Sequence, residues 1–142
     1  AITNGAVVDQ DRQTSAEGVF ACGNVLHVHD LVDFVSEEAE IAGKSAAQYI
    51  KGETEDAVDV NIKTDGKIRY TVPQKITKDK DITVFFRVAD VYKNVKVNVV
   101  KNGEKVYSKK KIKVAPGEME SVKLTKDMFA GADELSFELE VL

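Results

Sequence analysis

The stretch VKVNVVKNGEKVYSKKKIKV, from Val95 to Val114, predicts a β-hairpin and decides the fold class of the second part of the chain. Its first valines alternate with polar residues, which is typical of a strand with one buried face. The pair Asn102-Gly103 follows, and Asn-Gly favours a two-residue hairpin turn because both residues tolerate a positive φ. Another run of strand-forming residues begins directly after the pair. We therefore expect two antiparallel strands here.

Period-two alternation recurs through the rest of this part. Ile68, Tyr70 and Val72 are predicted to share one face of a strand, because alternate residues of a strand point the same way. About seven strands fit into residues 58–142, with no room for crossover helices. This pattern predicts a mainly β fold, an antiparallel sandwich of immunoglobulin-like or fibronectin-like shape. The other runs and turn signals are Ile82–Val88, Leu135–Val141, Asp65-Gly66 and Pro116-Gly117.

The large and charged side chains of this part fit a sandwich better than a binding surface. The run Lys109–Lys111 is expected to keep an edge strand soluble rather than to bind phosphate or a polyanion. The aromatic residues expected in the core are Phe85, Phe86, Tyr92 and Tyr107.

The first part of the chain predicts one helix, over about residues 33–51, that ends before Gly52. The carboxylates of Glu37, Glu38 and Glu40 are expected to be solvated, since nothing in the sequence marks them for burial. An apolar stripe at helical spacing is expected to face a partner surface. Its residues are Leu31, Val35, Ala39, Ala42, Ala46 and Ile50.

Charge separates the two parts. Residues 1–57 carry a net charge of −8, and residues 58–142 carry +4. The polar segment 53–58 is expected to link a first unit, residues 1–52, to a sandwich unit, residues 59–142.

Composition excludes several classes of function. A net charge of −4 leaves no basic excess for binding nucleic acid. The apolar runs are only a few residues long, so we expect no membrane span. The single cysteine, Cys22, excludes an internal disulfide and is expected to be an inert thiol. With no secretory signal in the chain, we expect a cytoplasmic protein.

Two stretches of the first part carry a family resemblance. TSAEGVFACGNV (14–25) has the pattern of a strand that ends at a glycine, and EEAEIAGKSAAQYI (37–50) has that of a helix. Together they resemble the C-terminal flavin-contacting motif of the FAD-dependent pyridine nucleotide oxidoreductases (pyridine nucleotide-disulfide type). The link NVLHVHDLVDFVSEE is similar to the branch associated with glycerol-3-phosphate dehydrogenase and opine dehydrogenase subunits. The matching residues are Thr14, Ser15, Gly18, Val19, Phe20, Ala21, Gly23, Ala42, Gly43, Ala46 and Ala47.

The resemblance implies a set of FAD-binding residues. Gly23 would let the backbone approach the flavin, because it has no Cβ. The next position is an aspartate in the family that binds the ribityl chain, and here it is Asn24. Val32 and Asp33, at the start of the helix, would face the pyrimidine edge of the flavin with free N–H groups. No catalytic residue is implied.

The resemblance covers only about residues 1–51, and the chain has no G-x-G-x-x-G turn to hold a pyrophosphate. We therefore expect the C-terminal fragment of a larger flavoenzyme that passes electrons between NAD(P) and another acceptor. The fragment alone is expected to be inactive and to bind no FAD. Its expected partners are the rest of the parent flavoenzyme, a partner dehydrogenase subunit or a second copy in a homodimer. The alternative is a non-catalytic β-sandwich interaction module.

His27 and His29 are candidate metal ligands. Their spacing would suit an extended segment, with Asp30 or Asp33 as a third ligand, but no fourth ligand stands at a recognised spacing. The sequence therefore predicts no metal site. The two histidines are expected at a turn beside a cofactor or at the surface.

Overall fold

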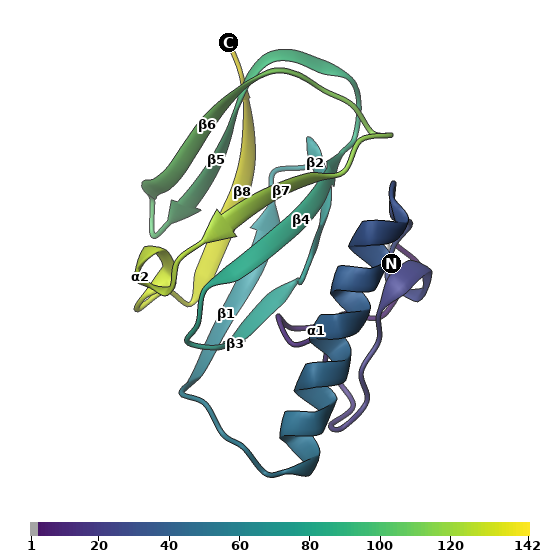
Figure 1. Ribbon diagram of the computed structural model, residues 1–142. Helices are drawn as coiled ribbons and strands as arrows, with labels where there is room; N and C mark the ends of the chain where they lie inside the picture. The colour runs from purple at the N-terminus through teal and green to yellow at the C-terminus, as the bar shows by residue number, and fades with distance from the viewer. Residues whose placement is uncertain (1–2) are drawn as a thin grey trace.

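The computed structural model describes residues 3–142 as a mainly β protein with two sheets and few helices (Figure 1). None of the helices in this range combines the length and apolar character needed to cross a bilayer. In chain order the elements are the 3₁₀ helix η1 (Gly23–Val25), α1 (Val32–Ile50), β1 (Ala57–Thr64), β2 (Ile68–Val72), β3 (Lys75–Lys78), β4 (Ile82–Val88), β5 (Tyr92–Lys101), β6 (Glu104–Val114), β7 (Glu120–Leu124), α2 (Lys126–Phe129) and β8 (Glu134–Val141).

The two sheets share one apolar core, as the layers of a β-sandwich do. The larger sheet has the strand order β3-β1-β8-β5-β6, and the smaller has the order β2-β4-β7. Val97 and Leu139 of the larger sheet lie in the same buried cluster as Val84, Phe86 and Val122 of the smaller one. Burial of this shared core supplies the main driving force for folding of this part.

One strand pair departs from the expected antiparallel arrangement. β1 and β8 are parallel, with Asn61 opposite Glu134 and Thr64 opposite Phe137. All other strand pairs in residues 3–142 are antiparallel. A parallel pair needs a long connection, and here the chain between β1 and β8 forms all the other strands. The prediction of a purely antiparallel sandwich is therefore wrong for this pair.

The hairpin prediction is confirmed. Asn102 and Gly103 both have positive φ, 50° and 83°, and Lys101 pairs with Glu104 across the turn. β6 is an edge strand of the larger sheet, and its run Lys109–Lys111 lies along that edge. The charged run is therefore placed where it opposes edge-to-edge pairing.

A register shift in β2 changes which face of the sheet its later side chains occupy, so they do not follow the simple alternation of the sequence. The pairing of β2 with β4 is irregular between Ile68 and Tyr70. Ile68 lies in the main core, whereas Val72 and Tyr70 pack in a second cluster with Val8 and Leu26. A bulge inserts a residue into one strand and so reverses the faces beyond it. The prediction that Ile68, Tyr70 and Val72 share one face is wrong.

The aromatic residues divide between two environments. Phe86 is buried in the main core, and Tyr92 and Tyr107 pack against that core, as predicted. Phe85 points to the other face of β4, where its ring lies 6.1 Å from that of Phe34 in α1. α1 runs alongside β4 in Figure 1, so Phe85 joins the helix to the smaller sheet rather than the two sheets to each other.

The first part of the chain forms the predicted helix but no strand. α1 matches the expected helix to within one residue at each end. Within residues 3–56, only the isolated bridges Val8–Thr14 and Gln13–Phe20 replace the expected strand. β1 already begins at Ala57, which shortens the expected linker.

α1 buries a different face from the predicted stripe. Its buried residues are Glu38, Ala42 and Ser45, while Ala39 and Ile50 are exposed. Of the expected stripe, only Ala42 is fully buried. The buried Glu38 contacts Arg12, Gly23 and His29, so polar contacts to the preceding segment help to hold the helix in place.

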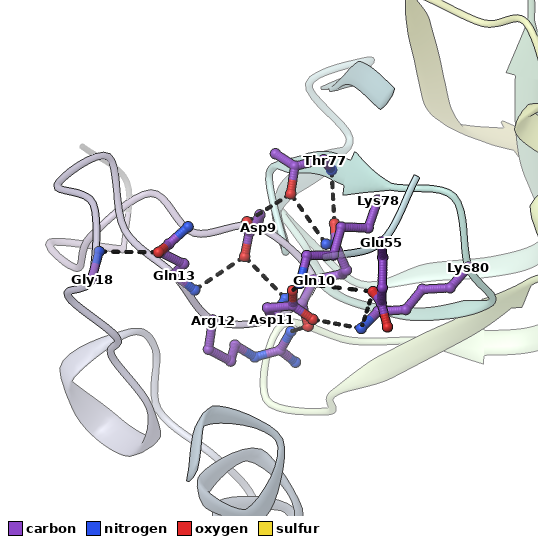
Figure 2. Close-up of polar contacts among 10 residues, drawn as sticks. All are labelled: Asp9, Gln10, Asp11, Arg12, Gln13, Gly18, Glu55, Thr77, Lys78 and Lys80. Carbon is purple, nitrogen blue, oxygen red and sulfur yellow. Dashed lines mark hydrogen bonds and ion pairs between the residues drawn. The ribbon is translucent and has the colours of Figure 1, made fainter. Parts of the chain in front are cut away.

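Charged and polar side chains join the N-terminal segment to β3 and the loop that follows it (Figure 2). Asp9 Oδ2 accepts a hydrogen bond of 2.7 Å from Thr77 Oγ1. Asp11 forms ion pairs with Lys78 and with Lys80, the latter at 2.7 Å. Burial alone would raise the pKa of Asp11, but hydrogen bonds from Lys78 and Lys80 outweigh it and lower that pKa below its ordinary value.

Acid is expected to weaken this junction. Because the pKa of Asp11 is lower in the folded than in the unfolded chain, its contribution is present above about pH 4 and is lost as the pH falls through the folded value. Urea unfolding between pH 6 and pH 3 should show a steeper loss of stability for the wild type than for Asp11→Asn. The exposed Asp127→Asn should follow the wild type. Parallel profiles of wild type and Asp11→Asn would contradict the assignment.

Candidate functional site

The centre of the candidate site is the carboxylate of Glu38, which is only 2% exposed. Arg12 Nε, on a side chain that is also 2% exposed, donates a hydrogen bond of 3.1 Å to Glu38 Oε2. The prediction that Glu38 is solvated is wrong. A local signal for its burial exists, because Glu38 follows Val35 by three residues and precedes Ala42 by four, the spacing of one helix face.

The other contacts of Glu38 come from the turn before α1. Oε1 accepts hydrogen bonds from Gly23 N at 2.8 Å and from His29 Nε2 at 2.9 Å. His27 Nε2 lies 3.6 Å from Oε2, and His27 Nδ1 lies 3.3 Å from Tyr70 Oη. We call Arg12, His27, His29 and Glu38 the Glu38 cluster. It joins three segments of the first part of the chain and, through Tyr70, reaches β2.

Glu38 is charged at every ordinary pH. Burial opposes the charge, but the nearby imidazole of His27, the hydrogen bond from His29, the charge of Arg12 and the Gly23 N–H outweigh it and lower the pKa of Glu38 from 4.5 to about 2. A carboxylate with this pKa is a poor proton donor at neutral pH. It can instead hold cationic groups and orient the turn that carries Gly23.

Arg12 lies in a tight turn of the N-terminal segment (Figure 2). Asp9 Oδ1 accepts hydrogen bonds of 3.0 Å from Asp11 N and from Gln13 N. Arg12 has a φ of 66°, and its Nη1 donates to Gln10 O at 3.2 Å. A positive φ is uncommon for a residue other than glycine, so the ion pair with Glu38 and the turn contacts hold Arg12 against a local preference.

The four residues that the resemblance implies as flavin contacts lie at one end of α1. Gly23 is buried, has a φ of 73° and donates to Glu38, as described. Asn24 is exposed and accepts a weak hydrogen bond of 3.4 Å from His29 N through Oδ1. Val32 and Asp33 are exposed in the first turn of α1. The structure therefore brings the Gly23 turn and the helix start together.

Exposed apolar side chains recur from η1 to the first residue of α1. Val25, Val28, Leu31 and Val32 are all more than half exposed, with Val32 at 75%. We call these four residues the apolar rim. Large exposed apolar groups that gather in one place are typical of a surface that another group covers.

The histidines lie in the turn before α1 and not at the surface, which was one of the two places expected for them. The side chains of His27 and His29 are 1% and 2% exposed, and their rings stack edge to face with centroids 4.5 Å apart. Neither proposed third ligand joins them. Asp30 instead forms an ion pair with Arg87 of β4, and Asp33 is exposed.

A groove of about 820 Å³ runs between α1 and the strands β4 and β7. Arg12 and Glu38 lie at its wall, next to Ile41 and Ser45 of the helix. Phe85 contributes to the opposite wall. The groove therefore connects the buried Glu38 cluster with the outside of the molecule.

Fold and site together define a β-sandwich that carries a helix and a polar turn against its smaller sheet, with a buried Arg–Glu–His cluster behind the turn. No protein-family model matches the chain, and no curated protein or solved structure matches it either. Function is therefore argued from the chain's own residues.

Proposed function

We propose that this chain is the C-terminal part of an FAD-dependent, NAD(P)-linked oxidoreductase, in which Gly23, Asn24, Val32 and Asp33 contact the flavin. The residues of the motif support the proposal by their order and spacing. The apolar rim carries it, because these side chains are exposed at the end of α1 where the motif would place the cofactor and the rest of the enzyme.

The helix start is suited to an anionic edge. Leu31, at the N-cap position of α1, makes no side-chain capping hydrogen bond, so the first N–H groups of the helix stay free for a ligand. A helix N-terminus favours negative charge, and reduced flavin carries such charge on its pyrimidine ring. The free N–H groups near Val32 and Asp33 would bind this edge.

Asn24 would play a modified role. Its Oδ1 already accepts a hydrogen bond from His29 N, so its NH₂ group is the part available to a ligand. A family aspartate accepts from the ribityl hydroxyls, whereas Asn24 would donate to a ribityl oxygen. The proposed contact keeps its position but reverses its direction.

The sandwich is proposed as a docking domain of immunoglobulin-like or fibronectin-like type, for a partner dehydrogenase subunit or a second copy. Its two sheets and shared core support this type. The alternative proposal is a non-catalytic interaction module. In that case, docking would be the whole function of the chain. The strongly exposed Ile112 on the edge strand β6 favours a docking role under both proposals.

The reading frame upstream of Ala1 distinguishes the oxidoreductase proposal from the interaction-module proposal. The oxidoreductase proposal expects a G-x-G-x-x-G turn between a strand and a helix, and a longer chain that purifies with bound FAD. In that longer chain, Gly23→Ala should reduce the FAD content, because alanine is strained at a φ of 73°. Gly117→Ala, which meets open space at an ordinary φ, is the matched control.

Residues 1–142 alone should take up no FAD when flavin fluorescence is followed during a titration. Micromolar uptake by this chain would contradict the fragment proposal. A start codon directly before Ala1 would leave the interaction module as the better explanation.

A further inference from the structure

Two buried nitrogen atoms of the Glu38 cluster have no hydrogen-bond partner. They are Nε2 of His27 and Nδ1 of His29, on side chains that are 1% and 2% exposed. Polar atoms in the interior are almost always satisfied, because an unpaired group loses its hydration without replacement. Of the two, Nε2 of His27 faces the carboxylate of Glu38, so it is an unused ligand atom in a buried place.

We propose that His27, His29 and Glu38 bind a divalent transition-metal ion of the Zn²⁺ class between them. Each side chain offers a ligand atom, and the three atoms lie within 4.8 Å of one another. This proposal replaces the expectation of no metal site that the sequence alone supported. It does not depend on flavin binding.

The separations of the two histidine nitrogens from Glu38 are close to those around a small ion, and all three ligand atoms lie within 4.8 Å of one another. Glu38 Oε1 lies 2.9 Å from His29 Nε2, and Glu38 Oε2 lies 3.6 Å from His27 Nε2. An ion with bonds of about 2.0–2.1 Å in tetrahedral geometry separates its ligands by about 3.3 Å. The observed separations lie on both sides of this value. Two imidazoles and one carboxylate form a ligand set typical of zinc and of non-haem ferrous sites.

Outer contacts are present for two of the three ligands. His27 Nδ1 lies 3.3 Å from Tyr70 Oη, which fixes the ring with Nε2 toward Glu38. Gly23 N and Arg12 Nε hold the carboxylate of Glu38. A metal-binding histidine commonly uses its other nitrogen in this way, and bound carboxylates are commonly hydrogen-bonded in turn.

Arg12 limits the affinity and leaves the site open. The guanidinium of Arg12 contacts Oε2 of Glu38, and its positive charge repels a second cation. We therefore expect weaker metal binding than in a closed structural zinc site. Three protein ligands leave a fourth position for water or another small ligand. The groove beside α1 has Arg12 and Glu38 in its wall, so an ion would approach the site from the side of Glu38.

Titration with Zn²⁺ alone tests the site in the complete chain. Protein treated with EDTA and freed of the chelator should take up one equivalent with a dissociation constant in the micromolar range or below, measured against a chromophoric chelator. Binding should release protons, because the imidazole nitrogens must be deprotonated. X-ray absorption of the zinc adduct should show two imidazole ligands. Co²⁺ in place of Zn²⁺ should give visible bands of low-coordinate cobalt.

Variants that keep the hydrogen bonds separate ligation from folding. His29→Gln can still donate to Glu38, and His27→Asn can still reach Tyr70, yet each loses a transition-metal ligand. Each should weaken zinc binding by more than the ~10–100-fold that an outer partner contributes. Tyr70→Phe, a positioning variant, should weaken it about tenfold. Asp33→Asn, the ligand suggested by sequence alone, should bind zinc as the wild type does.

Three results would overturn the proposal. One is uptake of less than one equivalent of Zn²⁺ by the wild type at micromolar concentrations. Another is a zinc adduct without imidazole scattering, which decides the question even if the histidine variants do not fold. The third is unchanged affinity in His29→Gln with a native circular dichroism spectrum.

Discussion

Glu38→Ala is expected to destabilise the chain by about 3–5 kcal/mol, the cost of breaking a buried ion pair from one side. The substitution leaves the guanidinium of Arg12 buried with no opposite charge. It also removes the acceptor of Gly23 N and of His29 Nε2. Three donors from two segments lose one acceptor residue, so the loss of stability should exceed that of a single hydrogen bond.

Urea unfolding at neutral pH measures this loss. Glu37→Ala is the matched control, because Glu37 is the preceding residue of the same helix and is exposed. Its effect should stay within about 0.5 kcal/mol. The destabilisation caused by Glu38→Gln should lie between those of Glu38→Ala and Glu37→Ala, since the amide oxygen still accepts hydrogen bonds but carries no charge. A cost below about 1 kcal/mol for Glu38→Ala, the value of an exposed ion pair, would mean that Glu38 is solvated after all.

The fold was predictable where the signals are local. Asn102-Gly103 and the alternation beside it contain everything that a hairpin needs within a few residues, and the hairpin formed with the expected turn. The helix was also predictable, because its periodicity and the glycine stop at Gly52 lie in one segment. Such features depend on sequence neighbours and not on the remainder of the fold.

Features that depend on distant residues were missed. The burial of Glu38 requires Arg12, which lies 26 residues earlier in a turn of its own. The spacing of Glu38 from Val35 and Ala42 is a local sign of its face of the helix, but nothing near it in the sequence indicates the charged partner that a buried carboxylate needs. Similarly, the register shift after Ile68 places Tyr70 beside His27, and period-two counting cannot predict an inserted residue. The parallel pairing of β1 with β8 is a contact between opposite ends of the sandwich sequence.

The candidate site also contains residues that are close in the sequence and residues that only the fold brings together. Gly23, Asn24, Val32 and Asp33 follow one another closely in the chain, so a sequence motif was sufficient to place them together. The cluster behind them assembles from separated segments and was visible only in three dimensions. The sequence thus indicated the outer surface of the site, and the structure added the groups that hold it.

Arg87→Met is expected to destabilise the chain by about 1.5–3 kcal/mol, the range of hydrogen bonds to charged groups. The side chain of Arg87 is 12% exposed and lies between the sandwich and the segment before α1. Its Nη2 donates to Val28 O at 2.8 Å and pairs with Asp30, while its Nη1 donates to Pro116 O at 3.1 Å. Asp30 also accepts from Met119 N, so this ion pair joins the segment before α1, β4 and the loop between β6 and β7.

The loss of stability in Arg87→Met should be greatest in residues 28–31, because this segment has few other polar contacts to the sandwich. Hydrogen exchange should show reduced protection of the amides in this segment, with β5 and β8 unchanged. Arg69→Met is the matched control, since Arg69 is exposed on the neighbouring strand β2. Equal exchange in the two variants would show that Arg87 does not hold the segment. Because Val28 and Leu31 of the apolar rim lie there, the same variant in a longer, flavin-binding chain should also lower its affinity for FAD.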